Sequence, residues 1–167
     1  KEYRRQRQMC IRDRVNNAGY AHFRPFTEIP VEEWRRTMEV NLTGPAMLTQ
    51  AFLPGMIARG SGRIINISSV AGLKGIPEQS AYVASKHALN GLTKVLAMEL
   101  NPLGIGVHAI CPGGVRTRLA DEAMPGRDKA DFMSPQDIAD AALYLCGLSP
   151  QTAVDIMTLR RTASTPL

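Results

Sequence analysis

The feature that most restricts the fold of this chain is the alternation of short apolar runs with long amphipathic stretches. The short runs are rich in β-branched or other apolar residues, as expected for strands buried on both faces, and cover 63–68, 105–110 and 154–159, with a stub at Val15. The long stretches repeat apolar residues at helical spacing and cover 31–59, 81–100 and a stretch that opens at Ser134. This order predicts an α/β protein whose parallel sheet is covered by helices, as in part of a doubly wound fold.

Several residues mark where these helices begin and end. Pro30 suits a first helical turn, where its missing N–H costs no hydrogen bond, and the Gly-Ser-Gly run at 60–62 stops the same helix. Ser134 is a good N-cap, Pro135 fits the first helical position, and Asp137 lies near the positive helix end. We therefore expect the last helix to start at Pro135.

The segments that follow the predicted strands are the candidates for a binding site, because ligands of doubly wound folds bind beyond the carboxyl ends of the strands. These segments are 16–19, 68–75, 112–117 and the C-terminal residues. Three of them hold the most distinctive residues of the sequence, so we expect a site where they meet.

The excess of positive charge does not indicate nucleic-acid binding. Residues 1–14 contain six basic and two acidic residues and so carry +4 of the net +5, which leaves only +1 on the rest of the chain. No interleaving of aromatic and basic residues supports a nucleic-acid groove. We predict no nucleic-acid partner.

Cysteine usage and hydropathy favour a cytoplasmic protein without a metal site or a membrane anchor. Cys10, Cys111 and Cys146 lie far apart, are odd in number and lack metal-ligand spacing, which argues against a disulfide framework or a zinc site. The three histidines also lack such spacing and are expected to be structural. No apolar stretch approaches the roughly 18 residues that a membrane helix needs, and the first residues lack the apolar core of a signal peptide.

A tyrosine and a lysine form a candidate acid/base pair. Tyr82 and Lys86 lie four residues apart at the start of the helix predicted over 81–100, so both side chains fall on one face. A free phenol has a pKa near ~10, but a nearby ammonium favours the phenolate and lowers that pKa. Such a tyrosine can give a proton to a carbonyl oxygen or take one from an alcohol. Ser69, at the end of the preceding strand, is placed to stabilise charge on that oxygen.

Each of these features is common by itself. Tyr-x-x-x-Lys pairs occur on many helix surfaces, and serine is a frequent turn residue. What indicates function is the joint pattern of five motifs in a fixed order. They are Asn-Asn-Ala-Gly, Asn-Leu-Thr-Gly, Ile-Ile-Asn-Ile-Ser-Ser, Tyr-Val-Ala-Ser-Lys and Pro-Gly-Gly-Val-Arg-Thr.

With these motifs, residues 15–117 resemble the C-terminal part of the one-domain short-chain dehydrogenase/reductase family, whose fold is a Rossmann-type doubly wound sheet. The resemblance implies an oxidoreductase that transfers a hydride between a nicotinamide cofactor, NAD or NADP, and an alcohol or carbonyl substrate. It implies that Tyr82 is the catalytic acid/base and that Lys86 lowers its pKa and binds the nicotinamide ribose. Ser69, 13 residues before the tyrosine, would hold the substrate oxygen. Asn41 would complete the catalytic set by holding a water in the proton relay.

The same resemblance assigns the cofactor contacts to two segments. The residues expected to support the central strand and touch the adenosine side of the cofactor are Asn17, Ala18 and Gly19. The residues expected to cradle the nicotinamide are Pro112, Gly113, Val115 and Thr117. Arg116 and Arg118 flank the last of these, either as solvated loop charges or as contacts for an acidic substrate or a cofactor phosphate.

Asn41 also has a role that follows from backbone chemistry. In an α-helix the N–H of each residue bonds to the carbonyl four residues earlier, and Pro45 has no N–H, so the Asn41 carbonyl loses its partner. A carbonyl freed in this way needs a water or another donor, which fits the water-holding role. The alternative is that Gly44 and Pro45 simply kink the helix, and both explanations stay open.

The sequence departs from the family at its beginning. The family opens with a strand and a Gly-x-x-x-Gly-x-Gly turn that binds the cofactor pyrophosphate, and nothing before Asn16 resembles it. We therefore expect the N-terminal half of the fold to be missing, together with the residue that separates NAD from NADP. Residues 1–14 are assigned to a basic segment foreign to the family, 15–160 to the domain and 161–167 to a loose tail. The 167-residue chain alone is expected to be inactive.

Two other functions stay open. A non-catalytic interaction protein would keep the fold without the chemistry, although intact Ser69, Tyr82 and Lys86 argue against this. An epimerase or dehydratase of the related longer family shares Tyr-x-x-x-Lys but generally lacks Asn-Asn-Ala-Gly. Members of the family commonly pair their two long helices, here 31–59 and 81–100, across a twofold axis, so a homodimer or homotetramer is expected.

Overall fold

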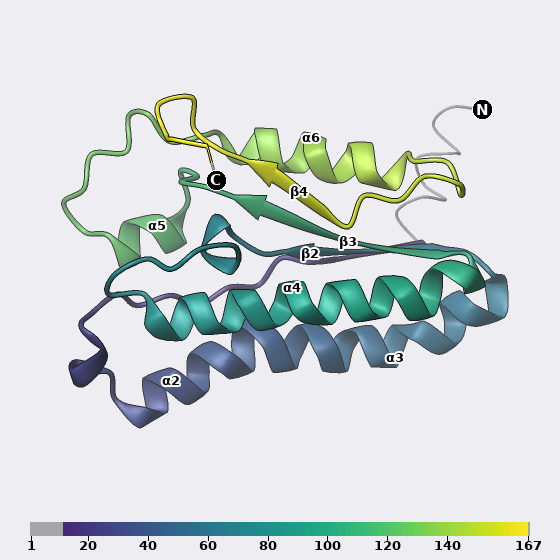
Figure 1. Cartoon of the computed structure of the whole chain (residues 1–167), viewed down its shortest axis with the longest axis horizontal. Helices are drawn as coiled ribbons and strands as arrows, with labels where there is room; N and C mark the ends of the chain where they lie inside the picture. Colours follow the sequence, from purple (N-terminus) through teal and green to yellow (C-terminus); the bar gives the residue numbers. More distant parts are fainter. Residues whose placement is uncertain (1–11, 167) are drawn as a thin grey trace.

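A computed structural model describes residues 12–166 of the chain and shows one four-stranded parallel sheet (Figure 1). The strands lie in the order β1-β2-β3-β4 and span Asp13–Asn16, Gly62–Ile67, Ile105–Pro112 and Ile156–Leu159. In this register Val15 pairs with Ile65, Ile65 pairs with His108, and Ile110 pairs with Met157. The predicted parallel α/β architecture is confirmed.

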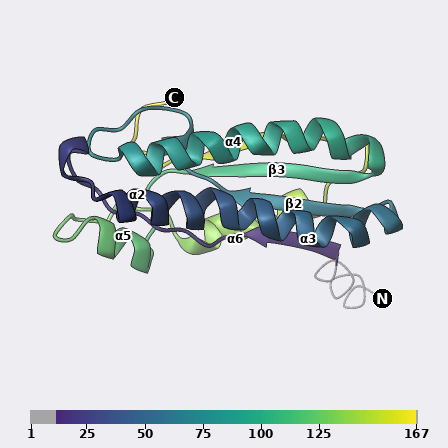
Figure 2. The same ribbon diagram turned by 90° about the horizontal axis from the view of Figure 1, so that it is seen from below.

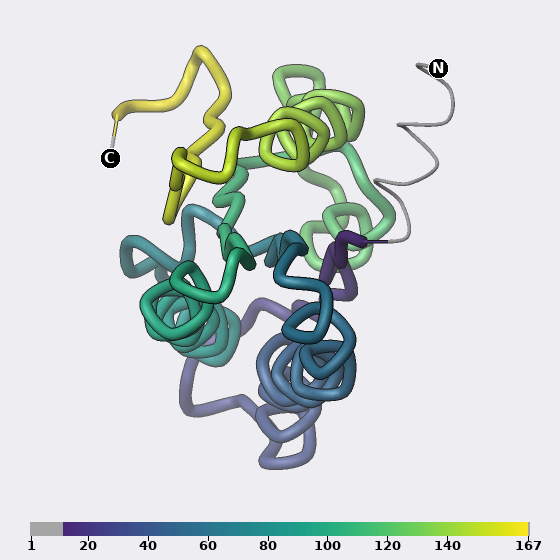
Figure 3. The backbone as a smooth tube through the Cα atoms, turned by 90° about the vertical axis from the view of Figure 1, so that its right-hand side faces the viewer, coloured from purple at the N-terminus to yellow at the C-terminus, as the bar shows by residue number. Residues whose placement is uncertain are grey.

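Helices cover both faces of the sheet, as the end-on view shows (Figure 3). On one face, α3 (Gly44–Arg59) and α4 (Ser80–Leu100) run side by side, with α2 (Val31–Met38) continuing the line of α3 (Figures 1 and 2). On the other face lies α6 (Pro135–Cys146). Shorter elements lie in the connections: η1 (Phe26–Glu28), η3 (Val70–Gly72), η4 (Asn101–Leu103) and α5 (Arg118–Ala123).

Two apolar clusters hold the layers together. The cluster under α3 and α4 consists of Met56, Ile64, Ala97, Leu100, Ile105 and Val107. The cluster under α6 has a buried centre of Ile65, Ile110, Ala141 and Leu145. Neighbouring residues such as Ile64 and Ile65 belong to different clusters because side chains alternate between the faces of a strand. Both faces of the central strands are therefore buried, as their continuous apolar sequence predicted.

The single helix expected over 31–59 is wrong in one respect. A π-helical turn, η2 (Glu39–Thr43), separates α2 from α3, and the N–H of Gly44 donates to the carbonyl of Glu39, five residues earlier. This turn lies directly before Pro45, which has no N–H to continue the ladder of i to i−4 bonds. The proline therefore accounts for an altered hydrogen-bond pattern within an otherwise continuous helix.

The signals at the helix ends are confirmed. Gly60 ends α3 in the left-handed region with φ 61°. At the start of α6, the Ser134 hydroxyl accepts from the Gln136 N–H at 3.2 Å, and the Asp137 carboxylate accepts from the Ser134 N–H at 2.8 Å. This is a capping box with Pro135 at the first helical position.

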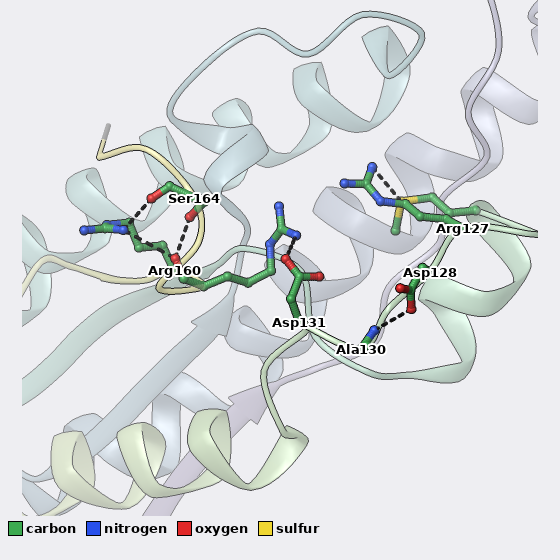
Figure 4. A network of polar contacts seen from close by, with 8 residues as sticks. Arg127, Asp128, Ala130, Asp131, Arg160 and Ser164 are labelled. Atoms are coloured by element: carbon green, nitrogen blue, oxygen red, sulfur yellow. Dashed lines mark hydrogen bonds and ion pairs between the residues drawn. The ribbon is translucent and has the colours of Figure 1, made fainter.

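The boundaries of the domain differ from the expectation at both ends. Strand β1 starts at Asp13, inside the segment assigned to the basic N-terminal region; the rest of that segment, residues 1–11, lies outside the described residues. Near the other end, the Arg161 guanidinium forms an ion pair with Asp131 at 2.5 Å, and the Ser164 hydroxyl donates to the Arg161 carbonyl at 2.8 Å (Figure 4). The residues after β4 therefore contact the segment that precedes α6.

No helix within residues 12–166 is both long and apolar enough to cross a membrane. Over the same residues, no three His, Cys, Asp or Glu side chains are grouped so that they could hold a metal ion.

Candidate active site

The three residues singled out as an acid/base centre lie at the carboxyl end of the sheet. Ser69 follows β2 and immediately precedes η3, while Tyr82 and Lys86 occupy the first two turns of α4. The arrowheads of β3 and β4 in Figure 1 point toward this end, where α4 begins. The topology therefore brings a strand end and a helix start together, as expected for a parallel sheet.

Backbone groups fix the side chain of Ser69. Its hydroxyl oxygen accepts from the N–H of Ala71 at 3.1 Å, so Ser69 acts as the N-cap of η3. The same hydroxyl lies 3.5 Å from the carbonyl of Pro112 at the end of β3, a long contact. Ser69 is therefore buried, and its hydroxyl lies beside the carboxyl end of β3.

Tyr82 is half-buried and lies against two side chains. The side chain of Ser69 lies close enough to the Tyr82 phenol to lower its pKa. The ring of Phe23 meets the Tyr82 ring edge-on, with centroids 5.8 Å apart and planes at 66°. Sequence reasoning missed Phe23, because its place depends on the path of the loop after β1. That loop is held by a hydrogen bond from the Arg24 N–H to the Glu78 carbonyl at 2.8 Å.

The pKa of Tyr82 differs from the expectation. Burial raises the pKa of this phenol above its ordinary value, and the neighbouring Ser69 side chain only partly opposes the shift. The predicted lowering of the Tyr82 pKa by Lys86 is therefore wrong. The ammonium lies 5.6 Å from the centroid of the tyrosine ring, and desolvation of the phenolate outweighs its attraction.

Lys86 is itself buried, with 3% of its surface exposed. Its ammonium donates to the carbonyl of Ile67, the last residue of β2, at 2.8 Å. Burial lowers the pKa of Lys86 to about 8, and the neighbouring Cys111 opposes this shift. The predicted contact of Lys86 with a nicotinamide ribose stays a prediction.

Asn41 lies in the π-helical turn and is fully buried. Its amide binds the backbone of Tyr20 twice, accepting from the N–H and donating to the carbonyl, each at 2.8 Å. The amide also donates to the Ser85 hydroxyl at 3.0 Å, and that hydroxyl donates to the Tyr82 carbonyl at 2.7 Å. Asn41 thus reaches α4 through its side chain, whereas the water at its backbone carbonyl stays a prediction.

The segments expected to hold a cofactor lie at the same end of the sheet. Asn17, Ala18 and Gly19 are exposed directly after β1. After β3, the N–H of Gly113 donates to the Leu159 carbonyl at 2.8 Å.

The next residues of this loop are also anchored. Pro112 is buried, Val115 forms a β-bridge with Met133, and the Thr117 hydroxyl accepts from the Ala120 N–H at 3.2 Å as the N-cap of α5. The side chains of Arg116 and Arg118 are exposed, and Arg118 pairs with Glu122 at 3.2 Å. The cradle expected for the nicotinamide is therefore a loop held by β4, Met133 and α5.

A chain of buried amides and hydroxyls crosses the sheet beneath the site, and sequence reasoning missed it. Asn16 on β1 donates to Thr49 on α3 at 3.2 Å and to the amide oxygen of Asn66 on β2 at 2.8 Å. Asn66 in turn donates to the hydroxyl of Thr93 on α4 at 2.9 Å. Asparagine inside a buried strand was the available signal, because such a polar group requires partners.

Comparison with known proteins agrees with this geometry. Residues 12–128 match the family model described as short chain dehydrogenase. The chain is 37% identical over 153 residues to the D-beta-hydroxybutyrate dehydrogenase of Rhizobium meliloti, covering 80% of this chain and 59% of that protein. It is 41% identical over 146 residues to the inactive 2-(S)-hydroxypropyl-CoM dehydrogenase 2 of Xanthobacter autotrophicus, covering 78% and 63% respectively. The chain thus spans about 60% of the length of these curated relatives.

Solved structures show the same fold. A putative NAD(P)-dependent gluconate 5-dehydrogenase from Beutenbergia cavernae with bound NADP superposes with a TM-score of 0.82 at 32% identity, covering 88% of this chain and 64% of that one. A 4-hydroxyisoleucine dehydrogenase mutant complexed with NADH and succinate gives a TM-score of 0.82 at 29% identity, covering 98% and 75%.

Proposed function

This chain belongs to the short-chain dehydrogenase family, and we propose that it carries the acid/base centre of an NAD(P)-dependent oxidoreductase that acts on an alcohol or a carbonyl compound. The observation that carries the proposal is that Ser69, Tyr82 and Lys86 lie together at the carboxyl end of the sheet, with the Ser69 side chain close enough to lower the pKa of the Tyr82 phenol and with Lys86 one helical turn away. Two hydroxyls placed in this way can both reach a single substrate oxygen placed against them.

The two hydroxyls have different roles at that oxygen: one transfers a proton and the other donates a hydrogen bond. In reduction, the Tyr82 phenol gives its proton to the carbonyl oxygen while the Ser69 hydroxyl donates a hydrogen bond to it. In oxidation, the tyrosine takes the proton of the alcohol. A bound nicotinamide supplies the hydride to the carbon in the first direction and accepts it in the second.

The electrostatics of the site favour the protonated form of the Tyr82 phenol. Because burial raises the pKa of Tyr82, the residue is ready to act as an acid at neutral pH. The base role requires the Lys86 ammonium to act on the phenolate, and the pKa of about 8 limits that charge to the pH range below about 8. Because the pKa of Lys86 lies below that of Tyr82, the form with both phenolate and ammonium increases with pH only up to about 8. We therefore expect the oxidation rate to rise with pH up to about 8 and to level off above it.

The residues present fit one side of a dinucleotide. Asn17, Ala18 and Gly19 are exposed directly after β1 and would contact the adenosine side of the cofactor, whereas the anchored loop from Pro112 to Thr117 would hold the nicotinamide. The sequence contains no Gly-x-x-x-Gly-x-Gly turn for the pyrophosphate. We therefore propose that cofactor binding requires residues in addition to these 167. On this proposal, the 167-residue chain alone does not turn over substrate.

The test is Tyr82→Phe in the complete protein that contains this chain. We expect the turnover number to fall by about three orders of magnitude or more, because the variant lacks the proton that the substrate oxygen requires. Affinity for the cofactor, followed by nicotinamide fluorescence, should persist. Tyr144→Phe, the same substitution at an exposed residue of α6, is the matched control and should leave turnover unchanged.

A non-catalytic interaction protein is the second candidate, and one observation favours it: a relative 41% identical to this chain carries the word inactive in its name. In that case the wild-type protein would show no turnover with any alcohol or ketone, and Tyr82→Phe would change nothing. Intact Ser69, Tyr82 and Lys86 favour the enzyme.

We also propose that copies of the chain associate as a homodimer or homotetramer through α3 and α4. These helices expose several large apolar side chains, namely Met47, Leu48, Phe52, Ile57, Val95 and Met98. Met98→Lys should weaken such an association, which sedimentation velocity would detect as a shift toward monomer.

A further inference from the structure

We propose that Asn90 is the positioning residue that sets Ser69 at its place relative to Tyr82 and Lys86; this inference rests on the function proposed above. Asn90 lies on α4 one turn beyond Lys86, and only 4% of its surface is exposed. A buried amide needs partners for both of its ends. Each end of this amide contacts a segment that also contacts Ser69.

The donor end of Asn90 holds the turn that follows Ser69. Its amide N–H donates to the carbonyl of Gly72 at 2.9 Å. Gly72 closes η3, and its own N–H donates to the Ser69 carbonyl at 2.9 Å. The N–H of Ala71 in the same turn donates to the Ser69 hydroxyl at 3.1 Å. The turn that orients the serine is therefore tied to the catalytic helix by one amide.

The acceptor end of Asn90 reaches the neighbouring strand. Its carbonyl oxygen lies 3.6 Å from the Cys111 sulfur, which donates to it. Cys111 directly precedes Pro112, whose carbonyl is the other contact of the Ser69 hydroxyl. The pKa of Cys111 is raised by burial, so the thiol keeps the proton that this contact needs.

The turn at Gly72 packs tightly against the donor end of the Asn90 amide. A Cβ atom added at Gly72 would lie 2.6 Å from the Asn90 amide nitrogen and 2.8 Å from the Lys86 carbonyl oxygen. The turn therefore rests directly on the helix, which only a glycine allows. A change in the side chain at position 90 must move the turn, and Ser69 moves with it.

The chemistry at this position calls for one donor and one acceptor, which asparagine supplies. Aspartate would face the Gly72 carbonyl with a second acceptor and would place a carboxylate in a buried position. Leucine has nearly the same size but leaves the Gly72 carbonyl without its partner. A role in packing alone predicts that leucine is tolerated, whereas a positioning role predicts that both changes damage catalysis.

The first measurement is single-turnover hydride transfer in the complete protein. We expect Asn90→Leu to slow this step about 10- to 100-fold, because small displacements of a positioned group cost rate on this scale. Asn90→Asp should be slowed at least as much, and affinity for the cofactor should change little in either variant. Thr93→Val, a buried polar residue one turn further along α4 that does not contact the turn, is the control and should keep the wild-type rate.

The deciding measurement repeats Asn90→Leu in a Ser69→Ala background. If Asn90 acts through the serine hydroxyl, the second change adds little to the first, so the rate of the double variant stays within about twofold of Ser69→Ala alone. Full additivity of the two losses, or a wild-type rate for Asn90→Leu, would overturn the inference. Absence of turnover in the wild-type protein would instead refute the proposed function, so the two failures are distinguishable.

Discussion

The two faces of the sheet differ in what they bury. Under α6, the buried centre is apolar and consists of Ile65, Ile110, Ala141 and Leu145. Under α3 and α4, apolar residues fill the amino-terminal end of the strands, whereas the carboxyl-terminal end buries polar side chains. These include Asn16, Asn41, Asn66, Ser68, Ser85, Lys86, Asn90 and Thr93.

This difference indicates a division of labour. Apolar burial supplies free energy but little directional constraint, because dispersion and the hydrophobic effect depend weakly on orientation. Buried hydrogen bonds contribute modest net stability, yet each one requires a defined distance and angle. The face that carries Tyr82 and Lys86 holds most of the buried side chains that make such directional contacts, and the other face acts mainly as an apolar support.

The largest expected effect tests the supporting face. Leu145, on α6, is fully buried against the sheet, and Leu145→Ala should lower the free energy of unfolding by about 4 kcal/mol through lost apolar contact and a residual cavity. Leu143→Ala, at a position 63% exposed on the same helix, is the control and should change stability by less than about 0.5 kcal/mol. Urea unfolding followed by circular dichroism measures both, and equal losses would contradict the assignment of the core.

The second prediction concerns Lys86, whose buried charge lowers the stability of the folded protein. The folded pKa of Lys86 is about 8, below the unfolded value of 10.5, so the unfolded state binds more protons between these pH values and stability rises with pH there. Below pH 8 the burial of the ammonium costs about 3 kcal/mol. Replacing the lysine also leaves the Ile67 carbonyl without its donor, which costs about 1 kcal/mol.

Lys86→Met should therefore raise the free energy of unfolding by about 2 kcal/mol at pH 7, while removing catalysis. The gain should shrink as the pH rises from 8 toward 10.5, because the wild-type lysine then loses its charge in the folded state. Urea unfolding at pH 7 and pH 10 measures the difference. A gain of the same size at both pH values would show that the buried charge is not its cause.

The smallest effect concerns the buried chain of hydrogen bonds. Thr93→Val keeps the shape of the side chain but leaves the amide of Asn66 without its acceptor, so stability should fall by about 1 kcal/mol. Thermal unfolding would show a slightly lower Tm. A rise in Tm would mean that the polar face tolerates an apolar replacement. That result would contradict the proposed difference between the two faces of the sheet.

Much of the fold was predictable because it follows from local rules. Strands 63–68 and 105–110 and the helix over 81–100 agree with β2, β3 and α4 to within two residues, since periodicity and breakers act locally. The six-residue helix α5 was not predicted, because it is too short for a periodic pattern and is held by the Thr117 cap. Pro45 predicted that the hydrogen-bond pattern of the helix would be altered near Asn41. It did not predict a π-helical turn, whose residues pack against α4.

For the candidate site, the sequence by itself determined which residues gather at the carboxyl end of the sheet. The order of strands and helices places Ser69, Tyr82 and Lys86 there, since parallel strands end at one edge. Only the tertiary structure decided their electrostatics and their supports. Burial sets the raised pKa of Tyr82 and the lowered pKa of Lys86, and it depends on every element packed around them. The contacts of Phe23 and Asn90 likewise join segments far apart in the chain, which no local pattern encodes.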